Sequence, residues 1–387
     1  MKILHTADLH IGGAFAGFPP KVAAEMRRKG VLVFGKIADY AKENGITKFL
    51  IAGDLFDTSM PSADMRDAVL SVFRQHSGIS FYLINGNHDS GLPLEFRMRL
   101  PENVFLFGKG ISEYDLGESV SLFASDDETI DAKDLSLNPE RTNILMFHAA
   151  VGAKIDRCLI NPDCFEGKPL DYLALGHYHS YSSGKCGRGE YVIPGTPAAR
   201  GFDDTGEKGF VVFDTEKRTH EFVPTNESEF FVLTYELKGE EVDISALSDF
   251  LLKSGAEKGD YVKLILTGKT STLRVDCEYI GKRLGSGFGD IRVEDKTGIA
   301  DEEFGSSALY DEFRKYLTEL DKKHRACRQG AYGRRQKRDS ALRIRRAQGR
   351  KRGFSLIKET SDDENKGIIR RRFRETQGSE NDLRRRS

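Results

Sequence analysis

The sequence predicts an α/β protein whose parallel sheet is extended by antiparallel strands. Short apolar runs alternate with helical patterns over residues 1–84, the order that parallel strands with crossover helices require. After about residue 100 strand-like segments are separated mainly by Gly and Pro turns, which favours hairpins. Five of the apolar runs end in polar clusters. Because ligands bind beyond the carboxyl ends of strands in open α/β sheets, these clusters predict a functional site.

Composition restricts the class of protein. The chain has 387 residues, 39% hydrophobic and 31% charged, which suits two or three globular domains with some polar length. No apolar run approaches the ~20 residues of a membrane-spanning helix, and the N-terminus does not resemble a signal peptide. We therefore expect a cytoplasmic protein without a membrane partner. The five cysteines form no Cys-x-x-Cys pair, which argues against disulfides and a thiolate zinc site.

Residues 1–224 are expected to form the first domain. A helix is predicted over 21–43, where apolar residues recur at helical spacing up to the stop signal Asn44-Gly45. A second helix is predicted after Ser62, which suits an N-cap. The apolar runs predict strands at 2–6, 49–52, 81–84, 104–107, 120–124, 142–147 and 172–175, with further strand-like pieces over 190–223.

The pattern changes near residue 224, and residues 225–298 are expected to form a small α+β module. Strands at 230–236, 261–267 and 290–294 alternate there with helices at 244–253 and 273–284. Residues 299–323 follow as a linker with an amphipathic helix, whose apolar face carries Leu309, Phe313, Tyr316, Leu317 and Leu320. That face suits partner docking, and it equally suits packing on the helix's own domain.

Residues 324–387 are expected to form a basic, disordered tail, because apolar periodicity nearly vanishes there. Residues 322–387 hold 23 Lys/Arg against 8 Asp/Glu, a net charge of +15, which leaves −16 for residues 1–321. Two interpretations of the tail stay open. It could bind nucleic acid non-specifically, or it could be a divergent or frameshifted terminus without a catalytic role.

The polar clusters at the ends of the apolar runs contain metal-ligand residue types. Carboxylate, amide and imidazole donors without thiolates suit Mn²⁺, Fe²⁺ or Zn²⁺. Residues two apart share a face at a strand end, so Asp8 should lie beside His10, and His177 beside His179. The donors outnumber what one ion can hold with a position left for water, which favours two ions sharing a carboxylate. The candidate ligands are Asp8, His10, Asp54, Asn87, His148, His177 and His179.

The ordered motifs resemble those of the calcineurin-like metallophosphoesterase superfamily over about residues 1–215. They are Asp8-x-His10, Gly53-Asp54-x-x-Asp57, Gly86-Asn87-His88-Asp89, His148 and Gly176-His177-x-His179. The resemblance implies a four-layer α/β/β/α sandwich with two metal ions bridged by Asp54. One ion would be held by Asp8, His10, Asp54 and His179, and the other by Asp54, Asn87, His148 and His177. The chain departs from the pattern at Phe147-His148-Ala149, where members usually have Gly beside the histidine.

The same resemblance implies the catalytic groups. His88 matches the histidine that lies beside the phosphate, and an imidazole with a pKa of ~6.5 can donate a proton near neutral pH. Asp89 is expected to orient His88, with a turn carboxylate as the alternative. The implied reaction is hydrolysis of a phosphodiester by a hydroxide that the two ions activate.

Three segments resemble the SbcD-type DNA repair exonucleases: Ile3 to Gly12, Gly53 to Asp57, and Pro194 to Pro197. That resemblance implies manganese-dependent exonuclease and endonuclease activity in DNA end processing and recombination, with Fe²⁺, Zn²⁺ and Mg²⁺ as other metals. Residues 225–298 would be a DNA-binding capping domain. The implied partners are DNA and an SbcC-type coiled-coil ATPase, and a homodimer is compatible. Two alternatives stay open, a small-molecule phosphodiesterase or phosphatase and a non-catalytic partner-binding module.

Overall fold

The computed structural model describes residues 1–127, 135–152, 159–225, 228–238, 241–271 and 275–299, together with 315, 316 and 319. Met1–Ala300 form one compact unit. The linker helix expected around residues 309–320 and the basic tail lie outside the described residues, apart from those three isolated positions. None of the helices that the structure describes combines the length and apolar character that a bilayer crossing requires.

The first sheet has six strands and mixed direction. Strands β1 to β4 run parallel, and β13 and β14 are added antiparallel beside β1, as the sequence predicts. The strand order is β14 (Thr219–Pro224), β13 (Gly209–Asp214), β1 (Lys2–Thr6), β2 (Lys48–Ala52), β3 (Ser80–Ile84) and β4 (Val104–Leu106).

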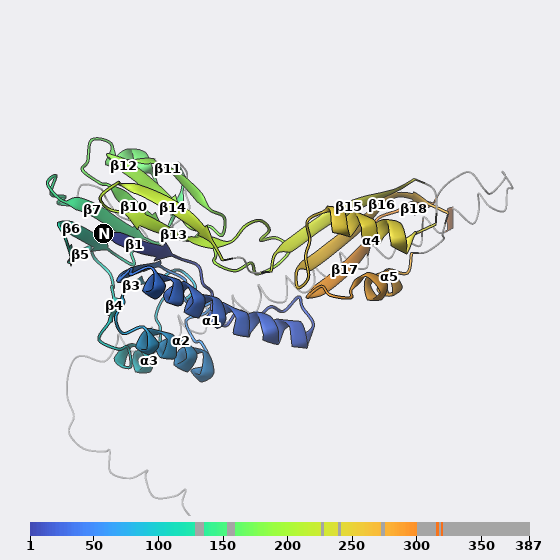
Figure 1. Cartoon of the computed structure of the whole chain (residues 1–387), viewed down its shortest axis with the longest axis horizontal. Helices are drawn as coiled ribbons and strands as arrows, with labels where there is room; N and C mark the ends of the chain where they lie inside the picture. The colour runs from blue at the N-terminus through green and yellow to red at the C-terminus, as the bar shows by residue number, and fades with distance from the viewer. Residues whose placement is uncertain are drawn as a thin grey trace, which may run out of the picture. The chain divides into compact units, whose positions relative to one another are not determined.

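Helices α1 (Pro20–Glu43), α2 (Ala63–Gln75) and α3 (Leu94–Met98) pack against one face of this sheet (Figure 1). The Ser62 hydroxyl caps α2 by accepting from the Met65 amide at 3.4 Å. Phenylalanines from helices and strands fill this layer, and burial of each contributes about 1.5–3 kcal/mol. They are Phe34, Phe49, Phe73 and Phe81, each fully buried.

The second sheet packs on the other face of the first. Its strand order is β11 (Ser182–Cys186), β12 (Gly189–Ile193), β10 (Tyr172–Leu175), β7 (Thr142–Phe147), β6 (Val120–Ala124) and β5 (Ser112–Gly117). Strands β6, β7, β10 and β12 run parallel, whereas β5 and β11 are antiparallel. The core between the sheets includes Ile3, Leu50, Tyr82, Ile144, Tyr172 and Val192.

The outer face of the second sheet differs from the expected four-layer arrangement. Leu170 and Phe165 cover it, and Phe165 is the last residue of a 3₁₀ helix at Pro162–Phe165. The short strands β8 (Ala150–Val151) and β9 (Leu159–Ile160) lie nearby in the chain. In the part of the chain that the structure describes, every α-helix before residue 225 packs on the first sheet. Two mixed sheets and one helical layer are thus confirmed, and the described segments contain no second helical layer.

Residues 230–299 build a separate sheet with its own core. Strands β15 (Phe230–Lys238), β16 (Tyr261–Thr270) and β17 (Asp290–Asp295) are parallel, and β18 (Gly298–Ile299) extends the pairing of β16. Helices α4 (Ile244–Lys253) and α5 (Cys277–Leu284) share one hydrophobic cluster with this sheet. The module is therefore α/β and not α+β, because each helix connects two parallel strands.

The second helix of this module begins four residues later than the sequence predicts. Asp276 is its N-cap, and its side chain accepts from the Tyr279 amide at 2.9 Å. Helical spacing in the sequence extends back to residue 273, but a capping carboxylate sets the first turn.

Candidate metal centre

Two loops of the first sheet are joined by backbone hydrogen bonds beyond the ends of their strands. The Asp8 amide donates to Gly53 O at 3.1 Å, and the His10 amide donates to Asp54 O at 2.9 Å. These bonds continue the pairing of β1 with β2 beyond the carboxyl ends of the two strands. The carboxylates of Asp8 and Asp54 therefore lie at the same end of the sheet.

The backbone is strained at four of the candidate ligands. The φ values are +52° for Asp8, +45° for His10, +52° for Asp54 and +86° for His177, all in a left-handed region that residues other than Gly seldom adopt. Such conformations persist only where the surrounding structure holds them, and they cluster at functional sites.

Two glycines allow the loops to approach closely. Gly53 has φ +89°, and a Cβ built on it would overlap the Nδ1 atom of His148. A Cβ on Gly86 would overlap Oδ1 of Asp54. The glycines of the Gly-Asp and Gly-Asn-His-Asp motifs are therefore required by close contact between loops.

Asp8, His10 and His179 form one group whose ligand atoms all lie within 4.8 Å of one another. His10 Nε2 is 3.7 Å from Asp8 Oδ1, and both side chains are buried. The rings of His10 and His179 are 5.1 Å apart between centroids. Three of the four residues expected at the first ion thus converge, and the fourth, Asp54, is 3.6 Å from His10.

Asn87, His148 and His177 converge in a second group. Asn87 Oδ1 lies 3.1 Å from His148 Nε2 and 3.1 Å from His177 Nδ1. Asp54 Oδ2 lies 3.5 Å from His148 Nε2, so this oxygen stands between His148 on one side and His10 on the other. All seven expected ligands therefore meet at the carboxyl ends of the parallel strands of the two sheets.

The histidines present the atoms that a bound metal would require. The Nδ1 atom of His148 donates to Ala52 O at 2.8 Å, which leaves Nε2 facing Asp54 and Asn87. His10 likewise has Nδ1 3.2 Å from Asp57 Oδ1, and His179 has Nδ1 3.9 Å from Asp204 Oδ2. A carbonyl or carboxylate behind the ring is the usual arrangement for metal-binding histidines, because it fixes the ring and its tautomer.

Buried polar atoms without hydrogen-bond partners support the same interpretation. Asp8 Oδ1 and the Nε2 atom of His10 are buried and lack hydrogen-bond partners. A buried unsatisfied donor or acceptor costs about 1–3 kcal/mol, so such atoms need an explanation. Carboxylate and imidazole groups arranged in this way fit divalent ions of the Mn²⁺, Fe²⁺ or Zn²⁺ type.

The electrostatics of the cluster depend on Asp54. Burial alone lowers the pKa of His148, but the carboxylates of Asp54 and Asp8 outweigh burial and raise that pKa to about 9. Burial raises the pKa of Asp54, but His148 and His10 lower it to about 2. Burial and the charge of His148 lower the pKa of His177. Since a divalent ion would displace the imidazole protons, its affinity for the cluster falls as the pH falls.

His88 lies at the rim of the cluster. Its side chain is 42% exposed, and its Nδ1 lies 3.2 Å from Asp57 O and 3.8 Å from Asp57 Oδ1. Its backbone amide donates to Asp54 Oδ1 at 2.8 Å. The imidazole is thus oriented from one side and open to solvent on the other.

The expected role of Asp89 in orienting His88 is not what the contacts show. Asp89 is buried, and its two carboxylate oxygens accept from the amides of Gly86 at 2.7 Å and Phe56 at 3.1 Å. Burial and the charge of Asp54 raise the pKa of Asp89 to about 6. Asp89 therefore joins the two loops, and the residue beside the His88 ring is Asp57.

Three residues beside the cluster, Asp57, Arg200 and Asp204, were not among the predicted ligands or catalytic groups. Asp57 contacts His10 and His88 and forms an ion pair with Arg200. Asp204 approaches His179, and its carboxylate pairs with the buried Lys208. Asp57 was visible as the last residue of the Gly-Asp-x-x-Asp motif, whereas the loop that carries Arg200 and Asp204 has no comparable spacing signal.

Residues 1–181 match the family model described as calcineurin-like phosphoesterase. This match covers the strands and loops that supply every candidate ligand. Residues 1–181 are therefore similar to the calcineurin-like phosphoesterases, and they contain Asp/His groups that could hold metal ions.

Several curated proteins are similar to this chain. An uncharacterized metallophosphoesterase YhaO of Bacillus subtilis is 26% identical over 54% of this chain and 56% of its own length. The D component of nuclease SbcCD of Staphylococcus saprophyticus is 32% identical over 23% of each chain. Exonuclease subunit 1 of Enterobacteria phage T4 is 26% identical over 62% of this chain and 72% of its own length. The chain thus spans little more than half of the YhaO protein.

Among solved structures, one described as a novel archaeal phosphodiesterase aligns with 58% of this chain and 99% of its own, at 14% identity. The TM-score is 0.32, and at that value the likeness carries no weight for fold or function.

Proposed function

We propose that the chain is a metal-dependent DNA nuclease, an exonuclease that processes DNA ends during double-strand break repair. The observation that carries the proposal is the position of Asp54 between His10 and His148, 3.6 and 3.5 Å away, within a phosphoesterase region. In this proposal Asp8, His10, Asp54 and His179 hold one divalent ion. Asp54, Asn87, His148 and His177 hold the other.

Two bound ions, proposed to be Mn²⁺, would supply the activation of water and the charge neutralisation that phosphodiester hydrolysis requires. The side chains of the protein itself hold the catalytic loop in place and supply a proton to the leaving oxygen. His88 Nδ1 donates to Asp57 O, so Nε2 is the ring nitrogen that can face the substrate. In the imidazolium form that Nε2–H donates a proton to the leaving oxygen. Asp89 keeps the loop in place by binding the Gly86 and Phe56 amides.

DNA is proposed as the substrate because two similar proteins carry nuclease names, the SbcCD component and the phage T4 exonuclease chain. We propose residues 225–298 as the DNA-binding capping domain, and residues 299–323 as the segment that binds an SbcC-type ATPase. The lysines and arginines of the module, Lys263, Lys269, Arg283 and Arg292 among them, supply phosphate-binding groups.

The proposal is tested with the full chain and Mn²⁺ on blunt duplex, hairpin and single-stranded DNA. We expect degradation of linear duplex that EDTA stops and that Asp54→Ala and His88→Ala abolish. Parallel reactions contain p-nitrophenyl phosphate and a cyclic nucleotide. Hydrolysis of either small substrate with none of the DNA species would identify a small-molecule phosphodiesterase or phosphatase. Metal binding without any hydrolysis would identify a non-catalytic binding module.

A further inference from the structure

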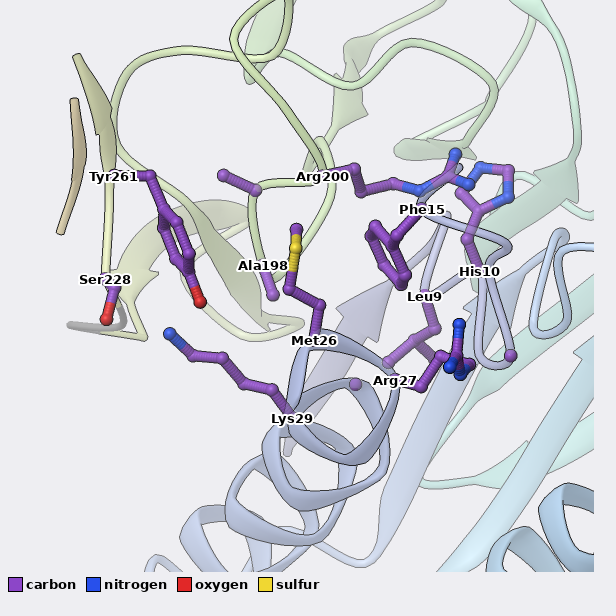
Figure 2. A pocket seen from close by; sticks show the side chains of 13 residues that line it. Leu9, His10, Phe15, Met26, Arg27, Lys29, Ala198, Arg200, Ser228 and Tyr261 are labelled. Atoms are coloured by element: carbon purple, nitrogen blue, oxygen red, sulfur yellow. The ribbon is translucent and has the colours of Figure 1, made fainter. Parts of the chain in front are cut away.

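Arg200 reaches the candidate metal centre from a different segment of the chain than the ligands do. It follows the turn after β12, and its guanidinium forms an ion pair with Asp57 through Nη2. Asp57 in turn lies 3.2 Å from the ring of His10. Figure 2 shows the Arg200 side chain extending toward the His10 ring. A cation therefore stands at the edge of a cluster built from carboxylate, imidazole and amide groups.

The loop that carries Arg200 is held by buried charged groups. The Arg200 amide donates to Asp204 Oδ2 at 3.2 Å, and Thr196 Oγ1 donates to the same oxygen at 3.3 Å. Lys208 pairs with the other oxygen of Asp204 and also donates to His179 O at 3.2 Å. Asp204 and Lys208 are 7% and 6% exposed. The position of Arg200 is thus tied to the strand end that carries His179.

The guanidinium has donors that Asp57 does not use. The Nε atom of Arg200 is buried without a partner, and in the described part of the chain Asp57 is the carboxylate paired with this side chain. The side chain is 23% exposed. It lines a hollow of about 500 Å³ together with Phe15, Phe202, Asp203, Lys263 and Arg292, in which Lys263 pairs with Glu294 and Arg292 with Asp290. A planar, partly exposed cation at the rim of a metal centre, with more donors than the one that binds Asp57, suits a phosphate oxygen.

The Arg200 guanidinium places a positive charge beside the Asp57 carboxylate, at the edge of the cluster. The same positive potential attracts an anion that approaches the cluster.

We propose that Arg200 is a substrate-binding residue that contacts a non-bridging oxygen of the substrate phosphate. This inference rests on the proposed phosphodiester hydrolysis. Asp57 holds the guanidinium at the cluster edge while its remaining donors face the substrate. A purely structural role would differ, because Arg200 would then only fix Asp57 behind His10, and its loss would act through the metal ligands.

The experiment measures phosphate binding and metal content separately. Full-length protein loaded with Mg²⁺ is titrated with inorganic phosphate by calorimetry, and bound Mn²⁺ per chain is counted by mass spectrometry after gel filtration. The variants are Arg200→Met, Arg200→Lys and Asp57→Asn. Arg74→Met removes an exposed arginine in the last turn of α2 and serves as the matched control. Circular dichroism shows whether each variant is folded.

We expect Arg200→Met to weaken phosphate binding about tenfold or more, because a charge-assisted hydrogen bond is lost, with the metal count unchanged. Arg200→Lys should recover part of the affinity, and Arg74→Met should match the wild type. Unchanged phosphate affinity in Arg200→Met overturns the inference. So does an equal loss of metal in Arg200→Met and Asp57→Asn. If the wild-type chain binds phosphate through Arg200 but leaves DNA intact, the nuclease proposal alone fails.

Discussion

Asn87 Oδ1 lies 3.1 Å from the Nε2 atom of His148, although Asn87 follows β3 of the first sheet and His148 follows β7 of the second. The contact exists because the carboxyl ends of parallel strands from both sheets open to the same edge. Groups from either sheet alone would give an incomplete set of ligands. The sandwich therefore brings together candidate ligands that the chain distributes over five loops.

Replacing His88 by alanine should remove catalysis and leave the fold intact. The imidazole is 42% exposed and packs only edge-on against the His10 ring, so the thermal midpoint should stay near that of the wild type. Loss of a general acid lowers turnover by about 10²–10⁴-fold. The measurement is kcat with DNA and Mn²⁺, with the count of bound ions as the control. A large fall in metal content would contradict the role given to His88.

Asp89→Ala should act mainly on stability. The carboxylate accepts from two buried amides, those of Gly86 and Phe56, and the substitution leaves both without partners. The expected loss is about 2–4 kcal/mol in the free energy of unfolding. Urea denaturation of the metal-free protein measures it. If stability is unchanged while the pH profile of turnover shifts, Asp89 acts on His88 after all.

Gly86→Ala should disturb the metal centre through a single methyl group. Its Cβ would overlap Oδ1 of Asp54, so either the carboxylate or the loop must move. Gly78→Ala is the matched control, because a Cβ there meets nothing within 4 Å and the residue has no positive φ. We expect Gly86→Ala to lose bound Mn²⁺ and Gly78→Ala to retain it. Equal metal content in the two variants would show that the close approach is unimportant.

His5 gives the protein a pH-dependent stability that is independent of the metal centre. It is fully buried, with Nε2 donating to Leu175 O at 3.1 Å and Nδ1 accepting from the Tyr172 hydroxyl at 2.9 Å. Burial lowers its pKa from 6.5 to about 3. Between these values the unfolded chain binds a proton that the folded chain does not, so stability rises with pH and is lost as pH falls through this window.

The expected contribution is about 1.4 kcal/mol of unfolding free energy per pH unit between pH 3 and 6.5. Denaturation of wild type and His5→Gln with EDTA at several pH values isolates it, because the cluster histidines titrate alike in both proteins. The plot of unfolding free energy against pH should be steeper for the wild type than for His5→Gln by that amount. Parallel curves would mean that His5 does not titrate on unfolding.

The sequence predicted most of the strands, and it predicted which candidate ligands lie close together, because both depend on local signals. Apolar runs define β1, β7 and β10, and ligand types directly after them mark the sheet edge. The contacts of Asp57 and Asp89 depend on how two loops face each other, which no spacing encodes. Arg200 comes from a turn with ordinary composition, and only the fold brings it to Asp57. The direction of strands in the second module likewise depends on crossover connections and not on apolar pattern.

The most direct test of a dinuclear centre bridged by Asp54 is the number of Mn²⁺ ions bound per chain in the wild type and in Asp54→Ala. Asp54 Oδ2 lies between His10 and His148, and we propose that it bridges both ions. Equilibrium dialysis followed by elemental analysis near neutral pH should give two ions for the wild type and at most one, weakly held, for Asp54→Ala. Two tightly bound ions in both proteins would contradict the bridging role, and a single ion in the wild type would contradict the dinuclear centre.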